Sequence, residues 1–176
     1  MSKISFFSIV CSIITGGFVL SASAAETPSP ADHPAAPSFT IRDIRNKLIV
    51  TDSLLKKGPV IIDFWATWCV HCMTEMKALQ HLVDTIGHDR FTVLAISQDG
   101  PAERSKVIQT ASVKKWPFII AIDNGKSVSR SYQVNALPAL FLIGTDGRIH
   151  VFSRGFSAGD EAALEATLRR MLDEKN

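Results

Sequence analysis

The sequence predicts an α/β fold in which a central mixed sheet carries helices on both faces, and three observations lead to that prediction. Apolar β-branched runs of strand length alternate with segments whose apolar residues recur at helical spacing, the pattern of βαβ units. In the last third, Gly144-Thr-Asp-Gly147 separates two apolar runs, which favours an antiparallel hairpin. Of the 176 residues, 46% are hydrophobic and 20% are charged, so one folded domain is expected.

The predicted elements begin with an N-terminal β-hairpin. Residues 39–42 and 47–50 have the content of two short strands, and residues 51–53 can cap a brief helix. The β-branched run at 59–65 predicts a strand buried in the centre of the sheet. After two cysteines, apolar residues recur at helical spacing until Gly87, which predicts a helix packed on that sheet.

The remaining elements continue the alternation and end with the antiparallel pair. Pro101 opens the second long helix, since proline is well tolerated in a first helical turn. Leu164, Leu168, Met171 and Leu172 form the apolar face of the last helix. The expected ranges are 91–97, 118–122, 139–143 and 149–152 for the strands and 101–114 for the second helix.

The first 24 residues predict a secretory signal. Lys3 is the only charge before Glu26, residues 4–20 are mostly apolar, and Ala22-Ser23-Ala24 supplies the small residues that a signal peptidase recognises. An uncleaved anchor is the alternative, because about 20 apolar residues can span a bilayer. We therefore expect export to the periplasm, with the protein either soluble or held by the apolar segment.

The segment after the signal differs in composition from the rest. Residues 25–37 are rich in proline, so we expect a linker there, and we assign residues 38–176 to one domain. Lysine and arginine number 19 against 17 acidic residues, and the basic pairs are scattered along the chain. No phosphate-binding face is predicted, and we expect no nucleic-acid partner.

Three cysteines are present, and two of them carry the functional signal. Cys11 lies in the predicted signal, which leaves Cys69 and Cys72 separated by two residues. A structural disulfide framework uses more cysteines at wider spacing, and so short a loop contributes little to stability. The pair is better explained by chemistry.

Cys69-Val-His-Cys72 lies where the central strand ends and a helix begins. A thiol in the first turn of a helix faces unpaired N–H groups and the positive end of the helix dipole, which favour the thiolate. We expect Cys69 to be the exposed, reactive thiol and Cys72 to resolve its mixed disulfides. His71 can add positive charge near Cys69, which would stabilise the dithiol and make the couple more oxidising.

Two acidic residues accompany the cysteines. Asp63 interrupts an otherwise apolar strand, so its carboxyl is expected to be buried, protonated and able to relay a proton to the inner thiol. A hydrogen-bonded core acid without a catalytic role is the alternative. Glu75 lies three residues past Cys72, and the residues alone describe it as a solvated helix charge.

Residues 60–72, Val-Ile-Ile-Asp-Phe-Trp-Ala-Thr-Trp-Cys-Val-His-Cys, resemble the active-site strand and helix start of the thioredoxin superfamily. Together with the expected export, they resemble the TlpA/ResA/CcmG (DsbE) group of bacterial thiol-disulfide oxidoreductases. Residues 132–143 are similar to the segment around the family's cis-proline, and the resemblance extends from about Phe39 to Leu172. It implies a thioredoxin-like fold and thiol-disulfide exchange with no cofactor and no metal.

The resemblance also implies roles for individual residues. Pro138 takes the place of the cis-proline beside the disulfide, and the backbone of Leu137 is then available to pair with a substrate strand. Trp68 and Val70 border the reactive sulfur as parts of the docking surface. These four residues are the expected substrate-binding set.

Asp63 matches the buried acid of thioredoxin itself, and Glu75 matches an acid near the active site in the ResA-like group. The sequence also departs from the family. Lys77 stands where the family usually has a proline that bends the active-site helix, so we expect no bend. The Val-His pair between the cysteines is similar to the Pro-His of the oxidase DsbA.

We predict an exported protein thiol-disulfide oxidoreductase, most simply a reductase in the maturation of cytochrome c or related proteins. Its partners would be protein substrates with thiols or disulfides and a membrane redox partner of the DsbD or DsbB type. A DsbA-like dithiol oxidase is one alternative. A Cu(I)-binding chaperone is another, because Cys69, His71, Cys72, Met73 and Met76 are soft or borderline ligands, although helical spacing favours Met76 in the core.

Overall fold

The computed structural model describes residues 33–157 and 159–174 and is built around a five-stranded sheet of order β5-β4-β3-β6-β7. The strands are β3 (Val60–Trp65), β4 (Thr92–Ser97), β5 (Ile119–Ile122), β6 (Ala139–Ile143) and β7 (Ile149–Arg154). β3, β4 and β5 run parallel, whereas β6 is antiparallel to β3 and to β7. The predicted combination of βαβ units with a C-terminal hairpin is confirmed.

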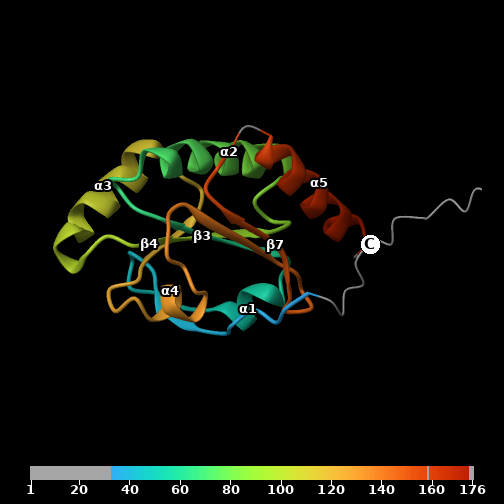
Figure 1. Ribbon diagram of the computed structural model, residues 1–176, viewed down its shortest axis with the longest axis horizontal. Helices are drawn as coiled ribbons and strands as arrows, with labels where there is room; N and C mark the ends of the chain where they lie inside the picture. The colour runs from blue at the N-terminus through green and yellow to red at the C-terminus, as the bar shows by residue number, and fades with distance from the viewer. Residues whose placement is uncertain (1–32, 158, 175–176) are drawn as a thin grey trace, which may run out of the picture.

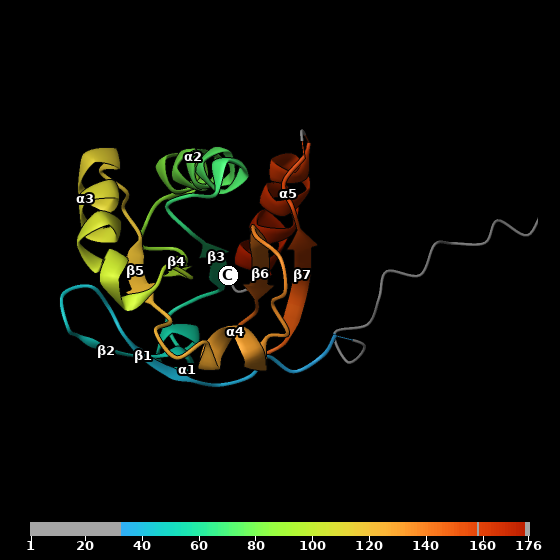
Figure 2. The ribbon, with the colours of Figure 1, turned by 60° about the vertical axis from the view of Figure 1, so that its left-hand side comes forward.

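Helices cover both faces of this sheet (Figure 1). Figure 2 shows α2 (Val70–Ile86), α3 (Arg104–Lys114) and α5 (Asp160–Asp173) side by side on one face. α1 (Thr51–Leu55) and α4 (Ser127–Ser131) lie on the other face. A 3-10 turn at Pro101–Glu103 leads into α3. The sequence does not predict α4, because five residues are too short to show a helical period.

The N-terminal part of the domain forms a separate small sheet. β1 (Thr40–Arg42) and β2 (Leu48–Val50) pair antiparallel, as expected for a hairpin. Residues 33–37, the end of the expected linker, lie along the turn between β6 and β7, where the Ala36 N–H donates to the Gly147 carbonyl at 2.8 Å. The described chain therefore enters at the end of the sheet opposite to the C-terminal end of β3.

The predicted signal, residues 1–24, and the first part of the predicted linker lie outside the described residues. Within the part of the chain that the structure describes, no helix combines the length and the apolar character needed to cross a bilayer.

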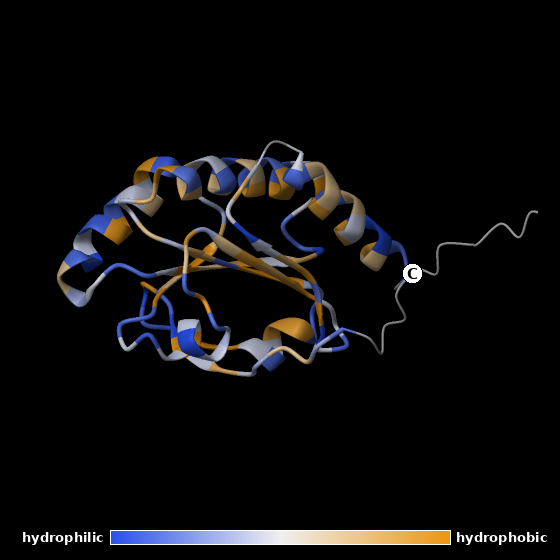
Figure 3. Cartoon of the chain, viewed as in Figure 1, coloured by the Kyte–Doolittle hydropathy of each residue, from blue (hydrophilic) through white to orange (hydrophobic). Residues whose placement is uncertain are grey.

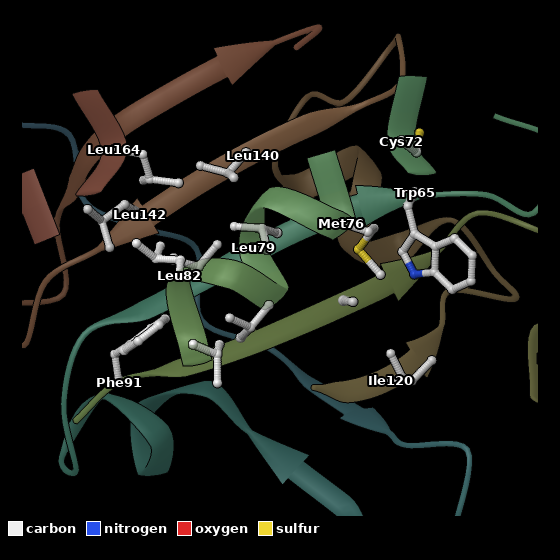
Figure 4. Close-up of a cluster of buried hydrophobic side chains, with 14 of the residues drawn as sticks. Trp65, Cys72, Met76, Leu79, Leu82, Phe91, Ile120, Leu140, Leu142 and Leu164 are labelled. Atoms are coloured by element: carbon white, nitrogen blue, oxygen red, sulfur yellow. The ribbon is translucent and has the colours of Figure 1, made fainter. Parts of the chain in front are cut away.

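Two hydrophobic clusters fill the space between the sheet and its helices. The larger joins the sheet to α2, α3 and α5 and includes Leu79, Leu142 and Leu164 (Figure 4). The smaller lies under α1 and α4 and includes Phe141. Figure 3 shows apolar residues along the strands and mixed polarity around the helices. All six residues of β3 are buried, so the Asp63 carboxyl lies inside the core.

Candidate active site

Cys69 and Cys72 lie at the junction of β3 and α2. Cys69 is the N-cap of α2, and its Sγ accepts a hydrogen bond from the Cys72 N–H at 3.2 Å. A disulfide joins the two sulfurs. In the reduced protein, the first-turn N–H groups and the helix dipole would stabilise negative charge on a sulfur at this position.

The loop between β3 and Cys69 is held by Asp99, which the sequence reasoning did not single out. The buried Asp99 carboxylate accepts hydrogen bonds from the Thr67 N–H at 2.8 Å, the Thr67 hydroxyl at 2.7 Å and the Ser97 hydroxyl at 2.8 Å. Ser97 ends β4 and pairs with Trp65, the last residue of β3. The signal available in the sequence was a pair of polar residues directly after an apolar strand.

The residues next to the two cysteines, more than the cysteines themselves, form the surface around the disulfide. Cys69 is only 8% exposed and Cys72 is fully buried, whereas Trp68 is 66% and Val70 77% exposed. The expectation of an exposed Cys69 is therefore wrong for the disulfide form, because this residue packs into the larger core cluster. The His71 side chain is exposed and makes no hydrogen bond or ion pair with the described residues.

The segment before β6 completes this surface. The Leu137–Pro138 peptide bond is cis, in agreement with what the resemblance implies. Ala139, the first residue of β6, pairs with Phe64 near the end of β3. Pro138 therefore lies at the end of the sheet where β3 leads into the cysteine loop. Within the described chain, the Leu137 backbone has no hydrogen-bond partner. Leu137 and Trp68 line the same hollow, whose volume is about 330 Å³.

Asp63 on β3 and Glu75 on α2 are buried carboxyls, 0% and 1% exposed. They are close enough for each to affect the other's pKa, yet neither Asp63 oxygen nor Glu75 Oε2 makes a well-formed hydrogen bond to the described residues. Burial raises the pKa of Asp63 to about 7. Burial, and after it the Asp63 charge, raises the pKa of Glu75 to about 10. At neutral pH the pair therefore retains at least one proton.

The description of Glu75 as a solvated helix charge is wrong. Position 75 belongs to the buried stripe of α2, which also contains Cys72, Met76 and Leu79. That stripe follows the spacing of three and four residues, so extending the apolar pattern through position 75 was the signal for its burial. The carboxyl also lines a hollow of about 220 Å³ between α2, β7 and α5.

Most of the residues proposed as soft metal ligands belong to the larger hydrophobic cluster, which contains Cys69 and Cys72. Met76 is fully buried in the larger cluster, as its helical spacing predicted, and Met73 packs against the same cluster. Among the described residues, no group of three or more His, Cys, Asp or Glu side chains is arranged to hold a metal ion.

A family model described as the AhpC/TSA family matches residues 33–152. Among curated proteins, the chain is similar to the thiol-disulfide oxidoreductase ResA of Bacillus anthracis. The two are 32% identical over 114 residues, which cover 65% of this chain and 64% of that protein. ResA of Bacillus subtilis (strain 168) is 26% identical over 143 residues, covering 80% and 76%. The chain thus spans slightly under two thirds of the first of these relatives.

Solved structures show the same fold. A thiol:disulfide interchange protein of the thioredoxin family from Chlorobium tepidum superposes with a TM-score of 0.68 at 20% identity, covering 82% of this chain and 99% of that one. A secreted Mycobacterium tuberculosis disulfide oxidoreductase, described as homologous to E. coli DsbE, superposes with a TM-score of 0.64 at 20% identity, covering 75% and 95%. The fold is therefore thioredoxin-like, as predicted.

Proposed function

The chain belongs to the AhpC/TSA family, and from that premise we propose that it is a protein thiol-disulfide oxidoreductase of the ResA and DsbE type. One observation carries the proposal: a disulfide between Cys69 and Cys72 at the N-terminus of α2, bordered by exposed apolar side chains. A structural disulfide has no need of such a position, because closing a loop of two residues adds little stability.

In the reducing direction, the Cys69 thiolate attacks one sulfur of a substrate disulfide. The substrate S–S bond breaks, and the attacked sulfur forms a mixed disulfide with Cys69. The other substrate sulfur leaves as a thiolate. Cys72 then loses its proton and attacks Cys69 Sγ, which releases the second substrate thiolate and forms the Cys69–Cys72 disulfide. Two electrons pass from the dithiol to the substrate, and the substrate thiolates take up protons. The oxidising direction is the reverse.

Asp63 is proposed to receive the Cys72 proton, with Glu75 beside it holding a proton of its own. Both carboxyls are buried, and the pKa of Asp63 is raised to about 7, within the range useful for proton transfer at neutral pH. Cys72 and Glu75 lie three residues apart on the buried stripe of α2, which brings their side chains to one side of the helix. His71 is proposed to tune the couple through its charge near Cys69.

The docking surface is proposed to consist of Trp68, Val70, Leu137 and Pro138. The first two expose large apolar area beside Cys69. The Leu137 backbone groups lack partners within the described chain, so they are available to an extended substrate segment that adds as a strand.

We propose that the protein is exported and works as a reductase in the maturation of cytochrome c or related proteins. A membrane redox partner of the DsbD type would supply electrons in that case. A DsbA-like oxidase with a DsbB-type partner is the competing direction. The reduction potential of the couple decides between them, since a value of about −270 mV favours reduction and one of about −120 mV favours oxidation.

Two cysteine variants test the proposed activity. Wild type should reduce insulin or oxidise a reduced model protein, and Cys69→Ser should do neither. Cys72→Ser retains the attacking sulfur without the resolving one, so it should accumulate a mixed disulfide with the substrate that reductant releases. Thermal unfolding controls for folding. Activity of Cys69→Ser equal to wild type would refute the proposal.

A further inference from the structure

We infer that the hollow beside Trp68 selects substrates that carry an acidic side chain close to the reacting cysteine, an inference that rests on the proposed function. This Lys126 hollow, of about 330 Å³, is lined by Trp68, Gln98, Lys126, Arg130 and Leu137, with smaller side chains between them. It therefore opens between the loop that precedes Cys69 and the segment that leads to Pro138.

Two cations define the chemistry of the Lys126 hollow. Lys126 Nζ donates hydrogen bonds to the Gln98 carbonyl oxygen and, at 3.2 Å, to Gln98 Oε1, which hold the ammonium at the wall of the hollow. Arg130 lies one helical turn further, with its N–H bonded to the Lys126 carbonyl at 3.1 Å. Both residues line the same hollow, so the two charges add.

No acidic side chain lines the hollow. The ion pairs among the described residues use Arg90, His150 and Arg169 as their cations. Asp123, which precedes Lys126 in the chain, is buried, and its oxygens accept hydrogen bonds from the N–H groups of residues 127–129. The two cations are therefore left to complement an anion from outside the chain.

The hollow lies within reach of a docked substrate. Trp68 directly precedes Cys69, and Leu137 offers backbone groups that an extended segment can pair with. An extended chain advances about 3.3 Å per residue, so a residue within about two positions of the substrate cysteine would project into the hollow. A glutamate or aspartate there places its carboxylate near Lys126 and Arg130 and its methylene groups against Trp68.

Three disulfide-linked peptides test the inference. They are identical except for glutamate, serine or lysine beside the cysteine, and each is reduced by pre-reduced wild-type protein in single-turnover experiments. We expect the glutamate peptide to react about tenfold faster than the lysine peptide at low ionic strength, with serine between them. The preference should nearly vanish in 1 M salt, where the screening length is about 3 Å.

Arg130→Glu and Lys126→Gln assign the preference to the hollow. The first replaces an exposed side chain and should abolish or invert the order of the peptides, and the second should weaken it. The matched control is Lys106→Glu, an equal charge change on α3 at the other face of the sheet, which should retain the wild-type order. Arg130→Glu alone suffices if Lys126→Gln does not fold.

The outcomes separate this inference from the proposed function. Equal rates for the three peptides with wild type would overturn acidic selection while leaving the oxidoreductase intact. A preference that survives both Arg130→Glu and Lys126→Gln would also overturn it, because the selecting charge would then lie elsewhere. Failure to reduce any of the three peptides would refute the proposed reductase direction and the inference with it.

Discussion

Four acids are buried in the described part of the chain, and they form two pairs that differ in their hydrogen bonding. Asp99 and Asp123, at 2% and 3% exposure, are surrounded by donors. Asp99 accepts from Thr67 and Ser97, and Asp123 accepts from three N–H groups at the start of α4. Asp63 and Glu75 are buried at least as deeply, yet neither Asp63 oxygen nor Glu75 Oε2 makes a well-formed hydrogen bond to the described residues.

This difference in hydrogen bonding separates acids that stabilise the fold from acids that reduce its stability. A buried carboxylate that accepts several hydrogen bonds organises the loop or helix that supplies them. A buried carboxyl without such bonds stays neutral only by holding a proton that water would release. Asp63 and Glu75 lie close to the disulfide end of β3 and α2, and perturbed carboxyls of this kind are characteristic of functional sites.

The largest expected effect is on the pH dependence of stability. Asp63 and Glu75 have ordinary pKa values of 3.8 and 4.5, and the fold raises them to about 7 and about 10. As pH rises above about 4, the unfolded chain loses both protons while the folded protein keeps them, so the free energy of unfolding falls. Between pH 4 and pH 8, each group contributes roughly 4 kcal/mol, so wild type should lose on the order of 8 kcal/mol more than Asp63→Asn/Glu75→Gln.

Urea unfolding of the oxidised proteins across this pH range measures the effect. Asp84→Asn, which removes an exposed carboxyl from α2, is the control and should leave the wild-type pH dependence in place. Parallel curves for wild type and the double variant would mean that the buried pair is not held protonated by the fold.

For the hydrogen-bonded acids we expect the opposite effect, because their removal should destabilise the protein. Asp99→Ala leaves the Thr67 N–H, the Thr67 hydroxyl and the Ser97 hydroxyl without their acceptor. We expect a loss of about 3 kcal/mol in the free energy of unfolding at neutral pH. Asp99→Asn retains one acceptor oxygen and should lose less. A stability equal to wild type in Asp99→Ala would remove the distinction between the pairs.

Most of the fold was predictable because its strands and long helices have local sequence patterns of apolar residues. β3 reads as a buried strand from its β-branched run, and α2 from the spacing that ends at Gly87. α4 was not predictable in the same way. Its five residues contain one apolar side chain, Val128, and its start is fixed by Asp123, so the helix depends on a tertiary acceptor more than on its own pattern.

The site was predictable where the chemistry lies in neighbouring residues and unpredictable where the fold assembles it. Cys69 and Cys72 are three positions apart, so their disulfide follows from sequence. The buried stripe of α2 was a signal for the burial of Glu75, whereas the packing of α5 beside it depends on the fold. The Lys126 hollow depends on the unpredicted α4, which explains why its cations had no signal in the sequence.

The proton-transfer role proposed for the unpartnered pair predicts a kinetic effect of intermediate size. Asp63→Asn removes the group whose pKa is raised to about 7, so resolution of the mixed disulfide by Cys72 should slow about thirtyfold at pH 7, or about 2 kcal/mol. Raising the pH should restore much of the rate, because solvent then deprotonates the thiol. A rapid-quench assay of the mixed disulfide measures this step.

Asp123→Asn is the matched control, since it alters an equally buried acid that has its own donors. Asp123→Asn should lower the stability of the protein. With a small neutral disulfide as substrate, it should leave the pH profile of mixed-disulfide resolution unchanged. Equal slowing in both variants would show that buried acids affect the reaction only through folding.

The smallest expected effect is that of the exposed His71 side chain on the reduction potential of the Cys69–Cys72 couple. His71 lies in the first turn of α2, exposed to solvent, so its attraction for a Cys69 thiolate is partly screened. His71→Ala should make the potential of the couple more negative by at most about 30 mV, or about 1.4 kcal/mol. His81→Ala, ten residues along α2 and about 15 Å further from the sulfurs, should leave the potential unchanged. Equilibration with glutathione distinguishes the two, and equal shifts would mean that His71 has no specific influence on the dithiol.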